Sequence, residues 1–109
     1  MNKKMINEEI REDLKNIRYY YLRKKTLDES FNLIGNNDIV EKIEFYNDIM
    51  KSAPLQLYDT YVALYVNNYT QESWANLICY TRESVNAYNR KLLKFIQGKI
   101  IEKRQLEVS

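Results

Sequence analysis

Apolar residues recur in steps of three and four along the N-terminal part of the chain, with charged and polar residues between them. Because an α-helix has about 3.6 residues per turn, this period predicts a helix from Lys4 to about Lys25 with one buried face. The predicted buried positions are Ile6, Ile10, Leu14, Ile17 and Tyr21. The acids of its first half are interpreted as a solvated face: Glu8, Glu9, Glu12 and Asp13.

The stretch "TLDESFNLIGNND" interrupts this period with several turn-forming residues. The helical pattern then resumes and predicts a second helix from about Asp38 to Lys51. Its buried side is predicted to carry Ile39, Ile43, Tyr46 and Met50. Pro54 ends this helix, because the residue before a proline avoids helical geometry, and it suits the first turn of the next helix.

A third helix is predicted from Pro54 to the pair Asn67-Asn68. One face is predicted to carry Leu55, Tyr58, Val62 and Tyr65, and this face is widened by Leu57, Tyr61 and Leu64. The pattern from residue 38 to 66 therefore predicts two helices that pack in the core.

Two helix starts follow closely between residues 67 and 96. Thr70 and Thr81 are both suited to the N-cap position, where a hydroxyl accepts a backbone N–H of the first turn. They predict a two-turn helix from Gln71 to about Ile78, a tight turn "CYT", and a longer helix. The apolar side of the short helix is predicted to be Trp74, Ala75, Leu77 and Ile78. The long helix is predicted to bury Val85, Tyr88, Leu92, Phe95 and Ile96.

Composition supports the same architecture, since only two glycines and one proline occur in 109 residues. Few breaks of this kind favour helices over a sheet rich in tight turns. We therefore predict an all-α single domain of four to five helices with a C-terminal helix-turn-helix. Its parts are an N-terminal helix and turn (1–35), two packing helices (38–66) and a helix-turn-helix with an extended recognition helix (70–104).

The residue inventory argues against several classes of site. With one cysteine and no histidine, neither a zinc site nor a histidine-based triad can be assembled. No paired carboxylates, phosphate-binding glycines or nucleophile–base set is identified, so we expect no enzyme, no metal and no cofactor. No run approaches the roughly 20 apolar residues of a membrane span, and no signal peptide is recognised, so we expect a cytoplasmic protein without a membrane partner.

The net charge of +2 hides an uneven distribution. Residues 1–51 contain ten Lys or Arg and ten Asp or Glu, whereas residues 81–104 contain seven Lys or Arg and two acids, a local excess of five. A basic stripe on one helix can attract phosphates, although it can equally be an ordinary solvated face.

The segment "TQESWANLICYTRESVNAYNRKLL" resembles the helix-turn-helix of sigma-factor region 4. Gln71 opens the unit, Ala75 is the small residue that lets the helices approach, and Val85 and Tyr88 stand where the second helix packs back. Cys79 occupies the turn position where such units often place glycine. From Asp38 to Ile101, the order of elements is similar to the RinA/ArpU/LtrC-type late transcription regulators of phages, which implies a small activator acting at a promoter.

Residue chemistry and this resemblance together predict a DNA-reading surface. A recognition helix presents its N-terminal residues to base edges in the major groove, where Arg suits guanine, Asn adenine and Glu cytosine. The predicted base-edge residues, taken to lie on the outer side of the helix, are Arg82, Glu83, Asn86, Ala87, Asn89 and Arg90. The predicted phosphate contacts are Thr70, Gln71, Tyr80, Thr81, Lys91 and Lys94.

Several residues have a structural interpretation that is preferred to a functional one. Trp74 is expected in the core, and Cys79 is expected to act as a small hydrophobe. Tyrosines on apolar faces are expected to pack rather than stack on bases: Tyr46, Tyr58, Tyr61, Tyr65 and Tyr88. The segment "RYYYLRKK" (18–25) is either a second nucleic-acid patch or, as we prefer, a dimer seam or a cover over the core.

The leading hypothesis is therefore a sequence-specific duplex-DNA-binding regulator of transcription. One alternative is a small terminase-like packaging protein, which would assemble into a ring. Another is a protein-interaction module of the same shape, with RNA polymerase as a potential partner. The sequence leaves open whether the first helix pairs two chains as a homodimer or packs within one chain.

Overall fold

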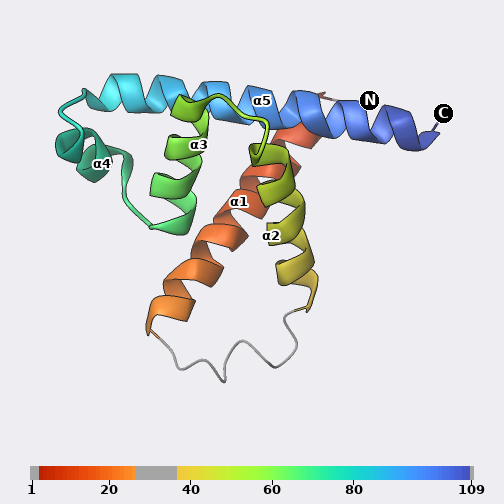
Figure 1. The fold of residues 1–109 in the computed structure, drawn as a ribbon, viewed down its shortest axis with the longest axis horizontal. Coiled ribbons are helices and arrows are strands. Elements are labelled where there is room, and N and C mark those ends of the chain that lie inside the picture. Colours follow the sequence, from red (N-terminus) through yellow and green to blue (C-terminus); the bar gives the residue numbers. More distant parts are fainter. Residues whose placement is uncertain (1–2, 27–36, 109) are drawn as a thin grey trace.

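The longest helix, α5 (Arg82–Val108), runs along one edge of the molecule, and the other helices lie on one side of it (Figure 1). The computed structural model describes residues 3–26 and 37–108. Along the chain, α5 is preceded by α1 (Lys3–Thr26), α2 (Asn37–Met50), α3 (Leu55–Tyr61), the π-helical segment η2 (Val62–Val66) and α4 (Gln71–Leu77). The described part contains five α-helices and no strand, which confirms the all-α prediction.

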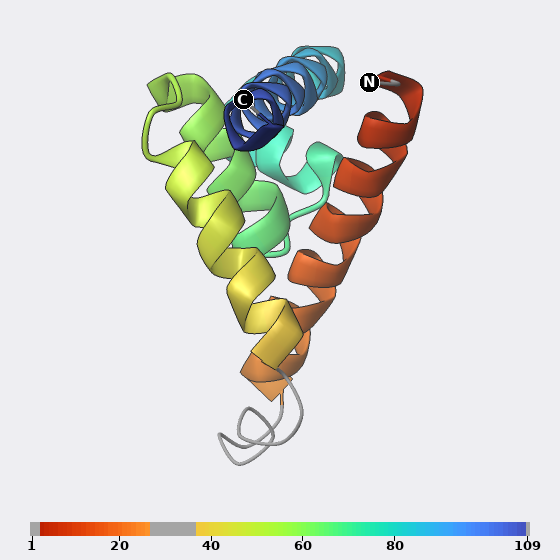
Figure 2. The ribbon, with the colours of Figure 1, turned by 90° about the vertical axis from the view of Figure 1, so that its right-hand side faces the viewer.

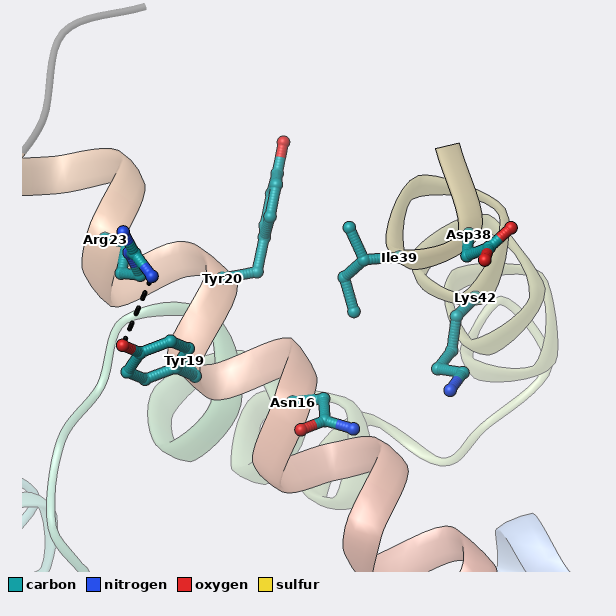
Figure 3. A pocket seen from close by; sticks show the side chains of 7 residues that line it. All are labelled: Asn16, Tyr19, Tyr20, Arg23, Asp38, Ile39 and Lys42. Atoms are coloured by element: carbon teal, nitrogen blue, oxygen red, sulfur yellow. Dashed lines mark hydrogen bonds between the residues drawn. The ribbon is translucent and has the colours of Figure 1, made fainter. Parts of the chain in front are cut away.

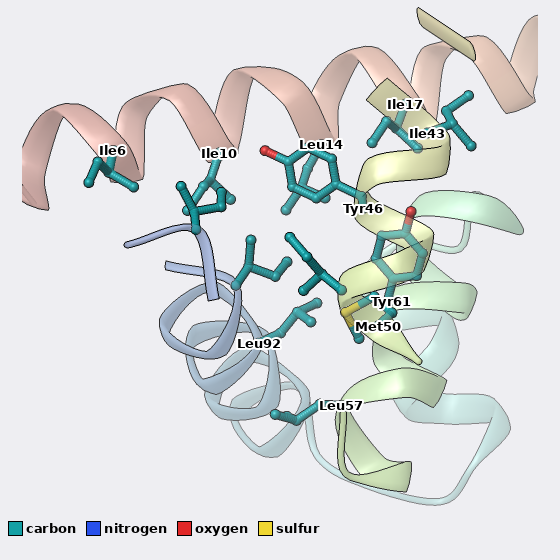
Figure 4. Close-up of a cluster of buried hydrophobic side chains, with 13 residues drawn as sticks. Ile6, Ile10, Leu14, Ile17, Ile43, Tyr46, Met50, Leu57, Tyr61 and Leu92 are labelled. Atoms are coloured by element: carbon teal, nitrogen blue, oxygen red, sulfur yellow. The ribbon is translucent and has the colours of Figure 1, made fainter. Parts of the chain in front are cut away.

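The core lies where α1, α2 and α3 meet α5 (Figure 4). The apolar face predicted for α1 is confirmed, because all four of its aliphatic positions are buried and Tyr21 packs at the edge. α2 contributes three of its four predicted positions as buried residues, with Ile39 at the margin. α5 supplies Leu92, Ile96 and Ile100. Seen end-on, α5 sits between α1 and α2 with its far side uncovered by described helices (Figure 2).

The face predicted for the third helix is only partly correct. Leu55 and Tyr58 are 73% and 44% exposed, which corrects these two positions, whereas the predicted Leu57, Tyr61 and Leu64 are buried, together with Thr60 and Ala63. Apolar residues surround this short helix, so its periodicity allows more than one face, and packing against α5 selects one of them. Burial of Thr60 is tolerated because its hydroxyl donates to the Gln56 carbonyl at 2.8 Å. The wider π-helical turn from residue 62 then changes the direction in which the following side chains point.

Arg18 of α1 holds the end of η2. Its Nε donates to the Leu64 carbonyl at 3.1 Å, and its Nη2 donates to the Asn68 carbonyl at 3.0 Å. In return, the Asn68 side-chain Nδ2 donates to the Arg18 carbonyl at 2.9 Å. Asn68 has φ 64°, a left-handed conformation that Asn tolerates better than most residues. These bonds satisfy carbonyls that a π-helical end leaves without helical partners.

Not all acids of α1 lie on a solvated face: the side chain of Asp13 is only 13% exposed, which corrects the sequence interpretation for this residue. The Asp13 carboxylate accepts from the Tyr46 hydroxyl at 2.6 Å and pairs with Lys42 at 2.9 Å, which links α1 to α2. Burial, together with the bond to Asp13, raises the pKa of Tyr46, so this phenol remains a donor. Glu9 accepts both of its bonds from Arg104, which links α1 to α5. Polar links between helices therefore surround the apolar core.

Candidate nucleic-acid interface

Both predicted N-caps of the helix-turn-helix are confirmed. The Thr70 hydroxyl accepts from the Ser73 N–H at 3.0 Å, and the Ser73 hydroxyl accepts in return from the Thr70 N–H. This reciprocal capping box starts α4. The Thr81 hydroxyl accepts from the Ser84 N–H at 3.1 Å and starts α5. The two helix starts are therefore fixed by local side-chain chemistry.

Cys79 stands at the turn position where the resembling units often place glycine, and its φ of 61° is a left-handed conformation. The Tyr80 N–H donates to the Ala75 carbonyl at 2.8 Å and the Cys79 N–H donates to the Asn76 carbonyl at 3.4 Å. This pair of bonds is the Schellman pattern that ends many helices. Ala75 and Val85 are both buried, which confirms their predicted positions in the contact between the two helices.

Replacing Cys79 by glycine is expected to raise stability by up to about 1 kcal/mol. A left-handed conformation costs an L-residue roughly 1–2 kcal/mol. Glycine removes this cost, but it lowers stability by roughly 0.4–1 kcal/mol because it increases the conformational entropy of the unfolded chain. Thermal unfolding measures the change. Cys79→Ala is the control, because it keeps the Cβ and the strain. A glycine variant no more stable than the alanine variant would contradict the observed turn geometry.

The apolar side of α4 is narrower than predicted. Trp74 and Ile78 are half-buried and line a shallow concavity of about 290 Å³ with Tyr80 and Tyr88. Leu77 is 62% exposed, which corrects its predicted burial. At about 100° per residue it lies roughly opposite Ala75, on the side of the helix that faces away from α5.

Ion pairing divides the basic stripe of α5 into two halves. In the C-terminal half, Lys99 pairs with Glu102 at 3.8 Å, Lys103 with Asp48 at 3.6 Å, and Arg104 with Glu9 at 2.9 Å. In the N-terminal half, the cations have no ion-pair partner among the residues that the structure describes: Arg82, Arg90, Lys91 and Lys94. The uncompensated positive charge is therefore concentrated in the half that directly follows the turn.

The predicted base-edge residues occupy different surroundings. Arg82, Glu83 and Arg90 are exposed, and Asn86 and Ala87 are half-buried. Asn89 does not lie on the outer side, which corrects its predicted orientation. It is half-buried, and its Oδ1 accepts from the Tyr65 hydroxyl at 2.6 Å.

The predicted phosphate contacts are also of two kinds. Tyr80, Lys91 and Lys94 are exposed, and the Lys91 ammonium lies 5.9 Å from the centre of the Tyr88 ring. The hydroxyls of Thr70 and Thr81 are engaged in the caps that they form. Gln71, the first residue of α4, is partly exposed. Among the predicted phosphate contacts, Lys91, Lys94 and Tyr80 therefore have the most accessible polar groups.

The fold adds cations of α1 to this surface, of which the sequence interpretation considered only Arg18, within the segment 18–25, and missed Arg11 and Lys15. Arg11, Lys15 and Arg18 of α1 line a cleft of about 510 Å³ with residues of α5 and η2. The α5 side of this cleft is formed by Asn86, Asn89, Arg90 and Leu93. The three α1 cations follow steps of four and three in the sequence, which places them on one helical face and was an available signal.

The segment "RYYYLRKK" is now partly explained. Tyr20 and Tyr21 pack against the core, which agrees with a cover over it. Tyr19 is exposed, and Arg23 lies over its ring and donates to its hydroxyl at 3.3 Å, at one side of an opening between α1 and α2 (Figure 3). The side chain of Lys25 and the predicted turn at residues 27–36 lie outside the described residues.

The tyrosine predictions are mostly confirmed. Tyr46 and Tyr61 are buried in the core, and Tyr65 and Tyr88 are half-buried. Tyr58 is the exception, because the third helix turns that position towards solvent.

Within residues 3–26 and 37–108, no group of three or more His, Cys, Asp or Glu side chains is placed to hold a metal ion. No helix in that part of the chain is both long enough and apolar enough to cross a membrane. Comparisons with protein-family models, curated proteins and solved structures find no match for this chain.

Proposed function

We propose that this protein binds duplex DNA in a sequence-dependent manner, with the N-terminal half of α5 in the major groove. The observation that carries the proposal is the division of charge along α5. Three C-terminal cations are paired with acids of the fold, whereas the four cations in the half that follows the turn have no such pair and are left for an external anion. DNA backbone phosphates are the anions that such a surface commonly binds.

In this proposal, residues of the outer face of α5 read bases and the flanking cations set the register. Arg82, Glu83 and Arg90 present charged groups to base edges, with Asn86 beside them and Ala87 allowing close approach. Asn89 is held by its hydrogen bond to Tyr65 and is not assigned a base contact in this proposal. Lys91, Lys94 and Tyr80 contact phosphates, with Gln71 and the cap residues Thr70 and Thr81 near the second strand.

The biological setting is supported by the resemblance to RinA/ArpU/LtrC-type phage regulators. It favours a cytoplasmic transcription regulator, and specifically an activator of late genes, rather than an enzyme. RNA polymerase and a second copy of the chain are the additional partners that such a regulator would use. The uncovered side of α5 (Figure 2) leaves room for DNA on the opposite side from α3.

Titration of a fluorescent duplex at about 50 and about 200 mM salt tests the proposal. Binding that weakens steeply with salt is expected, because each neutralised phosphate releases counterions. No binding at the lower salt would contradict it. Light scattering addresses the packaging alternative: a monomer or dimer supports a regulator, whereas a ring of many subunits supports a packaging protein.

A further inference from the structure

The cleft between α1 and α5 gathers positive charge from two distant parts of the chain. Arg11, Lys15 and Arg18 come from α1 and Arg90 from α5, and no Asp or Glu is among the described residues that line the cleft. None of these four cations has an ion-pair partner in the described part of the chain. A concave surface lined by one sign of charge concentrates its field and attracts ions of the opposite sign.

The polar groups of this cleft are mainly hydrogen-bond donors. The guanidinium of Arg18 is held in place by two backbone carbonyls. Asn89 accepts the Tyr65 hydroxyl at its Oδ1, so its Nδ2 is the group left for another partner. Burial raises the pKa of Tyr65, while the positive charges of Arg18 and Arg11 act in the opposite direction. The positive field of α1 therefore reaches the floor of the cleft.

We propose that this cleft binds a backbone phosphate of the DNA whose bases are read by α5. Phosphate oxygens only accept hydrogen bonds, and Arg and Lys are the side chains best suited to them. Asn86 and Arg90 border both the cleft and the predicted reading face. The cleft therefore lies directly beside that face, where the backbone of one strand passes a helix in the major groove.

The two sides of α5 border different hollows, and this arrangement supports the placement of the cleft beside a DNA strand. Tyr88, on one flank, faces the α4 concavity, whereas Asn86 faces the α1 cleft. At about 100° per residue, these two positions are roughly 160° apart around the helix. α4 and α1 thus flank the outer face on opposite sides, and each is placed beside one of the two strands that border a major groove.

The test compares Arg11→Gln/Lys15→Gln with the charge-matched control Lys51→Gln/Lys99→Gln. Arg11 and Lys15 are exposed, and the two control lysines lie in weak surface ion pairs away from the cleft. Duplex affinity is measured by fluorescence anisotropy between about 50 and 200 mM salt. The cleft variant is expected to lose affinity by on the order of tenfold or more, and its salt slope is expected to fall by roughly 1–2. A loss no larger than that of the control overturns the proposal.

Circular dichroism tests whether both variants are folded. If the double cleft variant is unfolded, the single variant Lys15→Gln replaces it in the comparison. The assignment of the bound phosphate to DNA rests on the proposed function. Binding of inorganic phosphate is therefore measured separately, by NMR titration. Saturable phosphate binding that disappears in the cleft variant, without a change in duplex affinity, overturns the DNA source in favour of a small phosphorylated ligand. If the cleft variant loses affinity for all duplexes and selection finds no preferred sequence, the cleft still binds a DNA phosphate, but the proposal that α5 reads bases is wrong.

Discussion

Replacing Leu92 by alanine is expected to destabilise the protein by about 2–5 kcal/mol, because it removes buried volume that the surroundings cannot fill completely. Leu92 is fully buried in the cluster where α5 meets α1, α2 and α3 (Figure 4). Since native domains are stable by only about 5–15 kcal/mol, the variant is expected to be partly unfolded and to lose DNA binding with its fold. Urea unfolding followed by circular dichroism measures the change in the free energy of unfolding.

Leu55→Ala is the matched control for this variant. Leu55 is the same residue type but is 73% exposed at the start of α3. Its replacement is expected to change stability by no more than about 0.5 kcal/mol, as surface substitutions usually do. Equal losses for the two leucines would contradict the observed core and the corrected face of α3.

The second large effect is expected on recognition. Arg82→Ala is expected to cost roughly 1–3 kcal/mol on the preferred site and to relax the preference at one base pair. Lys94→Ala is expected to weaken binding to all sequences alike, because a phosphate contact carries no sequence information. Affinities for a preferred duplex and for duplexes mutated at single positions separate the two effects.

Arg82 and Lys94 are suitable for this comparison because both are exposed and neither has an ion-pair partner among the described residues. Arg90 is less suitable, because it lines the α1 cleft as well as the outer face. If the Arg82 and Lys94 variants lose affinity in the same way on every sequence, α5 does not read bases directly.

The parts of the fold that depend on local chemistry could be predicted from the sequence. The apolar period of α1 and the threonine caps of α4 and α5 act within a few residues, so their sequence signals are complete. The third helix shows the limit of this approach. Its apolar residues allowed two faces, and the choice was made by packing against α5 and by the π-helical turn.

The candidate site was predictable only in part for the same reason. The helix proposed to read bases was predicted from its own residues, but the orientation of Asn89 depends on Tyr65 of η2. The contribution of Arg11 and Lys15 depends on where α1 crosses α5, about which helical periodicity carries no information. Likewise, the ion pairs of Lys103 and Arg104 join distant segments, so the uneven charge along α5 emerges only in the folded chain.

We expect α5 to read a DNA sequence, and selection of bound duplexes from a random pool tests this expectation most directly. At about 150 mM salt, non-specific binding is weak, so enrichment reports recognition. We expect an enriched motif, and a palindrome with half-sites about 10 bp apart would also indicate a dimer. Absence of any enriched motif, with only weak and salt-sensitive binding, would contradict it.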